Sequence, residues 1–210
     1  KKLEKIRPIV DRRDNPITGE SDKLMISIDN IENNKNRVQG TMKYDYPEIF
    51  QSRDGKKFQI RTKLANFTFM HGSGLFLLVH QNTGDSRIVK QNFARLAFLT
   101  QPPSILSCDI TPPTMTSFLE NNNCEVFSCS WDELDLPRIN GTNLKGAGIN
   151  NTDDFKRYDK HGNKNSVMFN FPEKNITLSI NRKAGVHFYT TLTRDQQEGF
   201  MKDKILPLCR

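Results

Sequence analysis

The sequence has no long apolar run, a single tryptophan and only four cysteines. Its longest apolar run, residues 75–79, has the length of one β-strand, whereas a transmembrane helix needs about 20 apolar residues. We therefore expect no membrane-spanning helix in this sequence and no membrane partner. The composition, 35% hydrophobic and 26% charged, is instead typical of a globular chain that can bury a core.

The scarcity of cysteine argues against both a metal centre and a disulfide scaffold. The four residues form no Cys-x-x-Cys pair, and no histidine follows them at a metal-ligand offset. Reduced cysteines are typical of intracellular proteins. We therefore expect no metal and no disulfide, and a location inside the cell, where this pattern does not distinguish cytoplasm from nucleus. The cysteines are Cys108, Cys124, Cys129 and Cys209.

Catalytic motifs are also missing, so we expect a non-enzymatic protein with no catalytic residue and no cofactor. The four histidines stand in none of the Ser, Cys or acid arrangements that nucleophilic catalysis requires. The acidic residues Asp132, Glu133 and Asp135 could bind a divalent ion, but no Lys follows them as a nuclease site would need. A hydrolase that uses the acidic residues around Asp132 ranks third among the functions considered. The alternative without a function is that these residues form an exposed strand end.

Positive charge is present in excess, and all of the excess lies in the first half. Residues 1–105 hold 18 Lys and Arg against 11 Asp and Glu, whereas residues 106–210 hold 13 against 13. With a pI near 9.3, this imbalance indicates an anionic partner, nucleic acid ahead of a membrane surface. The alternative is a general solubility charge in a Lys-rich organism.

The order of expected elements repeats between the halves. After an N-terminal basic segment (1–23), the first half predicts strands over 24–28, 37–44, 57–62, 66–71 and 75–80, then a helix over 86–99. The second half predicts strands over 124–131, 139–149, 166–171, 176–181 and 186–191, then a helix over 194–206 capped by Thr193. A short helix is expected over 114–121. We predict an α+β fold of two similar halves (24–105 and 106–210), each a curved antiparallel sheet of about five strands backed by a long helix. Two unrelated units, or one continuous domain, are the alternatives.

Two segments, 67–99 and 176–206, share the order strand, Gly-containing turn, strand and long helix. In this topology the chain resembles the TATA-binding-protein-like, or helix-grip, architecture of two repeats. The resemblance implies a curved sheet with helices on one face and an open face on the other. It extends over most of the chain in topology and carries no motif match, so the family's intercalating phenylalanines have no counterparts here.

The expected binding face follows from strand alternation. In residues 57–63, Phe58 and Ile60 point to one face, while two lysines, one arginine and one glutamine point to the other. Such a row can follow phosphates, with the amide reaching a base edge; the alternative is an edge strand protected by charge. The candidate nucleic-acid-binding residues are Arg37, Lys57, Gln59, Arg61, Lys63, Asn170, Asn181, Arg182 and Lys183.

These observations together predict a nucleic-acid-binding protein that uses an open sheet face and the basic first half, with duplex DNA favoured over RNA. The alternative is a protein-interaction subunit of a larger complex, which would dock its partner on the sheet face or edge.

Overall fold

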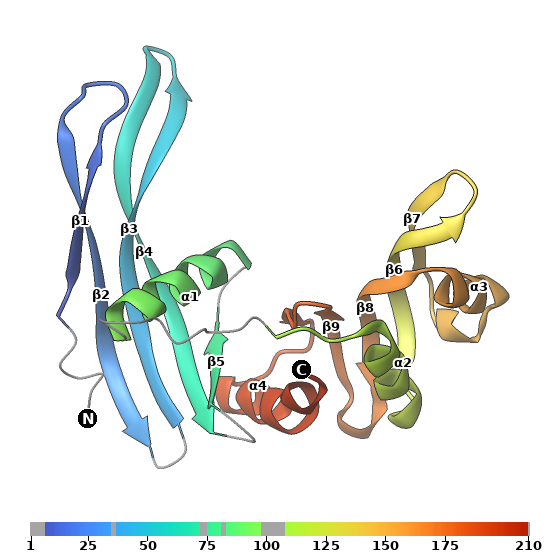
Figure 1. Cartoon of the computed structure of the whole chain (residues 1–210). Helices are drawn as coiled ribbons and strands as arrows, with labels where there is room; N and C mark the ends of the chain where they lie inside the picture. Colours follow the sequence, from blue (N-terminus) through green and yellow to red (C-terminus); the bar gives the residue numbers. More distant parts are fainter. Residues whose placement is uncertain (1–6, 35–36, 72–74, 81–82, 98–107, 210) are drawn as a thin grey trace. The chain divides into compact units, whose positions relative to one another are not determined.

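The computed structural model describes residues 7–34, 37–71, 75–80, 83–97 and 108–209. The chain divides into two compact units, residues 1–105 and 106–210 (Figure 1). Both are α+β, and each contains one five-stranded antiparallel sheet. In the described residues, no helix has the length and apolar character that crossing a membrane would require.

In its described residues, unit 1 is a sequential meander of five strands with one helix. Its strands are β1 (Ile9–Asp14), β2 (Ser21–Asn34), β3 (Arg37–Ser52), β4 (Gly55–His71) and β5 (Leu75–Val79), paired in that order, and its helix is α1 (Thr83–Ala97). The two strands expected over 57–62 and 66–71 are therefore parts of the single strand β4. No strand was expected in the segment 1–23, where β1 lies, because its sequence is too polar to show an apolar alternation.

The unit 1 core lies between the sheet and α1. Val89, Phe93 and Leu96 of the helix are buried, as the helical spacing predicted, and Phe93 meets Phe67 of β4 edge to face at 4.6 Å between ring centroids. Gly40 of β3 leaves room for the Phe67 ring, since a Cβ there would stand 2.7 Å from a ring carbon. Close packing at this point therefore requires a residue without a side chain.

Unit 2 combines a sheet with three helices. The elements in order are α2 (Pro112–Asn121), β6 (Glu125–Leu136), β7 (Ile139–Lys145), η2 (Ile149–Asn151), α3 (Asp153–His161), β8 (Asn163–Phe171), η3 (Pro172–Lys174), β9 (Ile176–Asn181), β10 (Val186–Phe188), α4 (Arg194–Phe200), η4 (Met201–Ile205) and η5 (Leu206–Leu208). No helix was expected between the strands over 139–149 and 166–171, but residues 153–161 form one. Thr152 caps it by accepting a hydrogen bond from the backbone N–H of Phe155.

The two sheets differ in strand order. Unit 1 is a plain meander, whereas unit 2 has the order β10-β9-β8-β6-β7, in which α3 connects β7 to a strand on the far side of β6. The helices also differ, because α1 is one 15-residue α-helix and the last helix of unit 2 changes from α to π to 3₁₀ geometry. These differences do not support the expected pair of similar halves.

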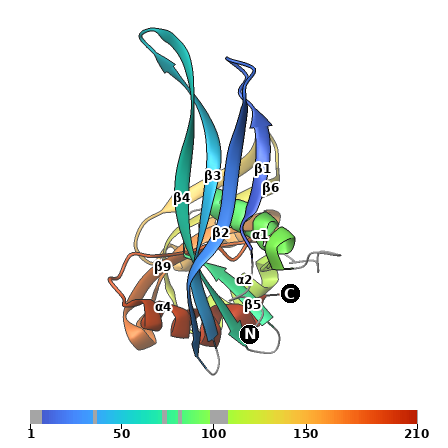
Figure 2. The same cartoon turned by 90° about the vertical axis from the view of Figure 1, so that its left-hand side faces the viewer.

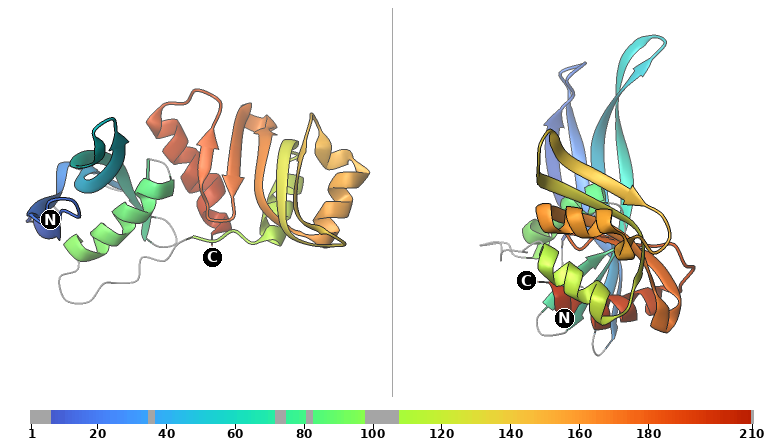
Figure 3. Two further views of the ribbon diagram at one scale, coloured as in Figure 1. Left: turned by 90° about the horizontal axis from the view of Figure 1, so that it is seen from above. Right: turned by 90° about the vertical axis from the view of Figure 1, so that its right-hand side faces the viewer.

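The helices of unit 2 share a core with the inner face of its sheet. Val167, Phe169 and Phe171 of β8 are buried, as their alternation predicted. Phe118 of α2 packs on Phe169 and Phe171, and Phe200 of α4 packs on Phe171. The views in Figure 3 show α2, α3 and α4 arranged along this sheet. Thr193 caps α4 with a complete capping box, which confirms the predicted helix start.

One disulfide closes unit 2, contrary to the expectation of four reduced cysteines. Cys108 and Cys209 are bonded, with their Cα atoms 5.3 Å apart, while Cys124 and Cys129 are free and buried. The pairing joins residues 101 positions apart in sequence. The sequence could not reveal it, because the fold alone brings the two segments together.

Candidate nucleic-acid interface

Residues 57–63, the basic segment of β4, lie in one of two projecting arms of unit 1. β2 and β3 pair over only part of their length, from Ile26 opposite Tyr44 to Asn34 opposite Arg37. Beyond that point the sheet divides into a β1–β2 arm (residues 9–26) and a β3–β4 arm (residues 44–63), each a two-stranded ribbon. Figure 2 shows both arms extending past α1.

The four predicted residues of the arm share one face, as alternation requires. On β4 they lie on the same face as Phe67, which packs against α1. They are further along the strand, beyond the helix: Lys57, Gln59, Arg61 and Lys63. They therefore extend the helix-bearing face of the sheet and do not lie on its opposite, open face.

Acidic partners neutralise part of this row. Arg61 Nε lies 2.7 Å from a carboxylate oxygen of Glu48, which also accepts a hydrogen bond from Gln59 Nε2 at 3.0 Å. Lys57 pairs with Asp54 at 3.0 Å. Both basic side chains remain about half exposed, at 55% and 50%, so each pair is open to solvent.

The remaining cations of the arm are Lys63, Arg53 and Lys56. Lys63 Nζ lies over the ring of Tyr46, 4.7 Å from its centroid, at the distance of a cation–π contact. Arg53 and Lys56 are exposed near the turn and have no ion pair among the described residues. The tip of the arm is therefore its most accessible positive surface.

Arg37 does not belong to this group. It lies opposite Met70, on the other face of the hairpin and at its other end, roughly 40 Å along the strand from Lys57 at the usual rise per residue. Its guanidinium donates to the side-chain oxygen of Gln39 at 3.2 Å, once that amide is oriented to accept. Arg37 is a sheet residue outside the arm.

The candidates of unit 2 occupy a sheet face and a turn. Asn170 points outward from β8, and its buried Oδ1 has no hydrogen-bond partner among the described residues. Asn181 Oδ1 accepts from the backbone N–H groups of Lys183 and Gly185, both at 2.9 Å, so it builds the β9–β10 turn. Of these two candidate amides, Asn170 therefore keeps an unbonded acceptor, and that oxygen is buried.

The two basic candidates of that turn have contacts of their own within unit 2. The backbone of Arg182 bonds to Asn165 and Ile110, and Lys183 Nζ lies 3.5 Å from Asp109. Lys183 is 70% exposed and still accessible to a partner.

The acidic group after Trp131 makes structural contacts. Glu133 adopts a positive φ of 54° and accepts a hydrogen bond from Asn163 Nδ2 at 2.7 Å. Within the described part of the chain, no three His, Cys, Asp or Glu side chains come together in a way that could hold a metal ion.

Sequence reasoning missed a second polar site, in unit 2. Lys164, Asp159, Trp131 and Thr116 come from four different elements and form one buried hydrogen-bonded cluster. No local motif in the sequence indicates this cluster, because its residues are spread over 49 positions, from Thr116 to Lys164.

In comparisons with known proteins, no family model matches this chain, and no curated protein matches it.

Proposed function

We propose that the protein binds nucleic acid through the β3–β4 arm, with duplex DNA favoured, and catalyses no reaction. One observation carries this proposal: the arm projects beyond α1 and holds five Lys and Arg against three Asp and Glu, while the neighbouring β1–β2 arm holds three against four. The β3–β4 arm thus has a net charge of +2 and the β1–β2 arm a net charge of −1, so only the β3–β4 arm is basic.

A two-stranded ribbon has the dimensions to enter the major groove of B-DNA, which is about 12 Å wide. In that position Lys57, Arg61 and Lys63 would contact phosphates, and the amide of Gln59 would reach a base edge. The ion pairs with Asp54 and Glu48 are no obstacle, because exposed pairs contribute only about 0–1 kcal/mol each. Recognition would be mostly directed at the backbone and sensitive to salt.

The test is a mobility-shift titration with duplex and single-stranded DNA over a series of salt concentrations. Each phosphate contact that is lost should reduce the slope of log affinity against log salt by roughly 0.9 for duplex DNA. The triple variant Lys57→Ala, Arg61→Ala, Lys63→Ala should therefore lose up to about 2.7 units of slope and keep its circular dichroism spectrum.

The β1–β2 arm supplies a matched control. The variant Arg12→Ala, Arg13→Ala, Lys23→Ala removes the same number of positive charges from the other ribbon, and its slope should stay near that of the parent. Equal losses in the two variants would show a general charge effect and refute binding by the β3–β4 arm. Absence of DNA binding by the parent at low salt would refute the function itself.

The second candidate function is protein interaction, as a subunit of a larger complex. It is favoured by the opposite face of the same arm, where Ile49 is 54% exposed and lies beside half-buried Phe58 and Ile60. Leu64, 61% exposed, is on the same face beyond Thr62. Single exposed apolar residues are common, but a group of neighbouring ones, such as Ile49, Phe58 and Ile60, is typical of docking surfaces. If the DNA experiment fails, Ile49→Ser with Leu64→Ser is the pair to test for loss of a partner.

The compartment bears on both candidates. We inferred an intracellular location from the expectation that all four cysteines are reduced. Two of them are bonded, Cys108 to Cys209, so only Cys124 and Cys129 still support that location. Disulfides persist mainly in oxidising compartments, so cell fractionation with a thiol count belongs beside the binding experiments.

A further inference from the structure

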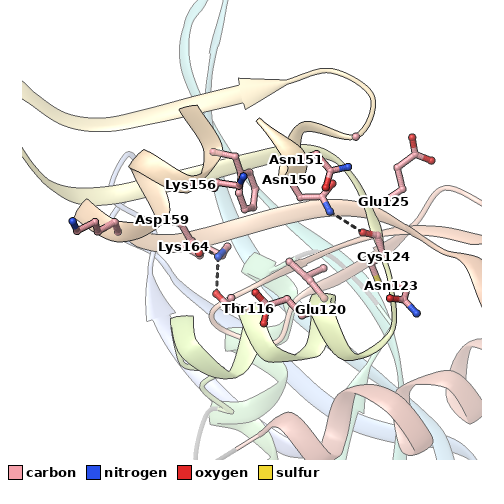
Figure 4. Close-up of a pocket in the computed structure, with 14 residues that line it drawn as sticks. Thr116, Glu120, Asn123, Cys124, Glu125, Asn150, Asn151, Lys156, Asp159 and Lys164 are labelled. Carbon is pink, nitrogen blue, oxygen red and sulfur yellow. Dashed lines mark hydrogen bonds and ion pairs between the residues drawn. The ribbon is translucent and has the colours of Figure 1, made fainter. Parts of the chain in front are cut away.

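Unit 2 contains a pocket that is independent of the arm. Its volume is about 860 Å³, within the range of about 300–1,000 Å³ typical of small-molecule sites. Residues of α2 and the start of β6 form one wall, residues of α3 form another, and Lys164 of β8 lies at the bottom. Figure 4 shows the labelled side chains around this space.

A β-bulge turns Lys164 into the pocket. Ser166 pairs with Ser130 and Lys164 pairs with Trp131, which leaves Asn165 as an extra residue on β8. The extra residue reverses the alternation, so that Lys164 shares the inner face with Val167 and is only 1% exposed. Bulges are frequent next to functional sites because they redirect a side chain in this way.

The bottom of the pocket keeps unused hydrogen-bonding capacity. The Lys164 ammonium donates to Thr116 Oγ1 at 2.6 Å and to Asp159 Oδ1, which also accepts from Trp131 Nε1 at 3.3 Å. An ammonium has three donors and a carboxylate two acceptor oxygens. One N–H of Lys164 and Oδ2 of Asp159 therefore have no hydrogen-bond partner among the described residues, and the ammonium also lies 5.2 Å from the centroid of the Phe155 ring. A donor and an acceptor stand side by side.

The two walls carry opposite charges. Lys156 and Lys160 come from α3, whereas Glu120 comes from α2 and Glu125 from β6. All four are exposed, and none has an ion pair among the described residues. Uncompensated charges of opposite sign on two walls match a ligand that carries both signs itself.

Apolar surface completes the lining. Leu119 and Phe155 are buried at 6% and 7% exposure and contribute to the pocket between its charged walls. A ligand with charged ends and an apolar body would bury that body against these two side chains.

We propose that this pocket binds a zwitterionic small molecule of the amino-acid or short-peptide class. Its carboxylate lies toward Lys156, Lys160 and the free N–H of Lys164, and its ammonium lies toward Glu120 and Glu125. The proposal rests on unit 2 alone and is independent of nucleic-acid binding by the arm.

The protein carries its own reporter for this site. Trp131 is the only tryptophan of the chain, is fully buried, and bonds to the same Asp159 that holds Lys164. We would titrate the full chain with the tripeptide Ala-Leu-Ala and follow Trp131 fluorescence, with calorimetry as a second measurement. Saturable binding is expected. Free leucine in parallel distinguishes the two sources: equal affinity assigns the site to a free amino acid, and weaker binding assigns it to a peptide.

Two exposed residues test the assignment of each charge. Glu120→Gln should weaken binding of the free tripeptide about two- to five-fold, the range for an exposed ion pair, and should leave binding of the N-acetylated tripeptide unchanged. Lys156→Gln should weaken the free tripeptide by the same factor and leave the C-amidated tripeptide unchanged. Asp135→Asn and Lys145→Gln, exposed residues outside the pocket, are the matched controls and should have no effect.

Three results would overturn the proposal. One is the absence of both a fluorescence change and calorimetric heat with every probe at about 10 mM, where even weak sites with dissociation constants near 1 mM would be occupied. Another is equal binding of capped and uncapped peptides. The last is an equal effect of control and pocket substitutions, which would show that the pocket does not read the two charges.

Discussion

The Cys108–Cys209 disulfide should be a main source of stability for unit 2. It joins residues 101 positions apart, and closing a loop of about 100 residues restricts the unfolded chain by about 4.7 kcal/mol in the chain-entropy account, with 2–4 kcal/mol typical of measured bonds. We expect the double variant Cys108→Ser, Cys209→Ser to lose about 2–4 kcal/mol of the free energy of unfolding of unit 2. Replacing both residues avoids leaving an unpaired thiol.

Urea unfolding followed by Trp131 fluorescence measures this loss. The only tryptophan lies in the core of unit 2, so the signal reports on that unit even if unit 1 unfolds separately. The variant should also show a larger m-value, because its unfolded state is less compact. The parent treated with dithiothreitol should match the variant, and dithiothreitol should not affect the variant.

Two results would refute this reasoning. A difference below about 1 kcal/mol between parent and variant would show that the bond contributes less than even the low end of measured disulfides. A count of four reactive thiols in the unreduced, denatured parent would show that Cys108 and Cys209 do not pair.

Three further predictions follow from single sites. Burial raises the pKa of the Cys124 and Cys129 thiols to about 12. Because the thiolate is the reactive form, both thiols should resist iodoacetamide at pH 8 in the folded protein. They should react as the pH approaches 12, and also at pH 8 in urea. Labelling of either thiol at pH 8 in the native state would contradict this. Gly40→Ala should destabilise unit 1 by about 1–3 kcal/mol, since the new methyl group would meet the Phe67 ring, as measured by thermal unfolding with circular dichroism; an unchanged midpoint would show that the ring moves freely. Gly199→Ala in α4, where a Cβ meets nothing within 4 Å, should leave unit 2 unchanged or stabilise it by up to about 1 kcal/mol, and a lower urea midpoint would argue against the helix there.

Sequence alone determined the local features of the fold. Three predicted features that depend only on residues a few positions apart are present in the structure. They are the helical stripe of Val89, Phe93 and Leu96, the alternation of β8 and β9, and the Thr193 cap. The common face of Lys57, Arg61 and Lys63 follows from the same period of two. Short-range geometry fixes these features, whatever the rest of the chain does.

Contacts distant in sequence decided the rest. Pairing of β6 with β8, beyond the hairpin with β7, sets the strand order of unit 2, and side chains of local segments do not encode that choice. The bulge at Asn165 depends on the register between two strands, and it alone turns Lys164 from a surface residue of a polar strand into the buried floor of a pocket. A one-residue change of register exchanges the two faces of a strand, so the position of this charged side chain could only be decided by the tertiary structure.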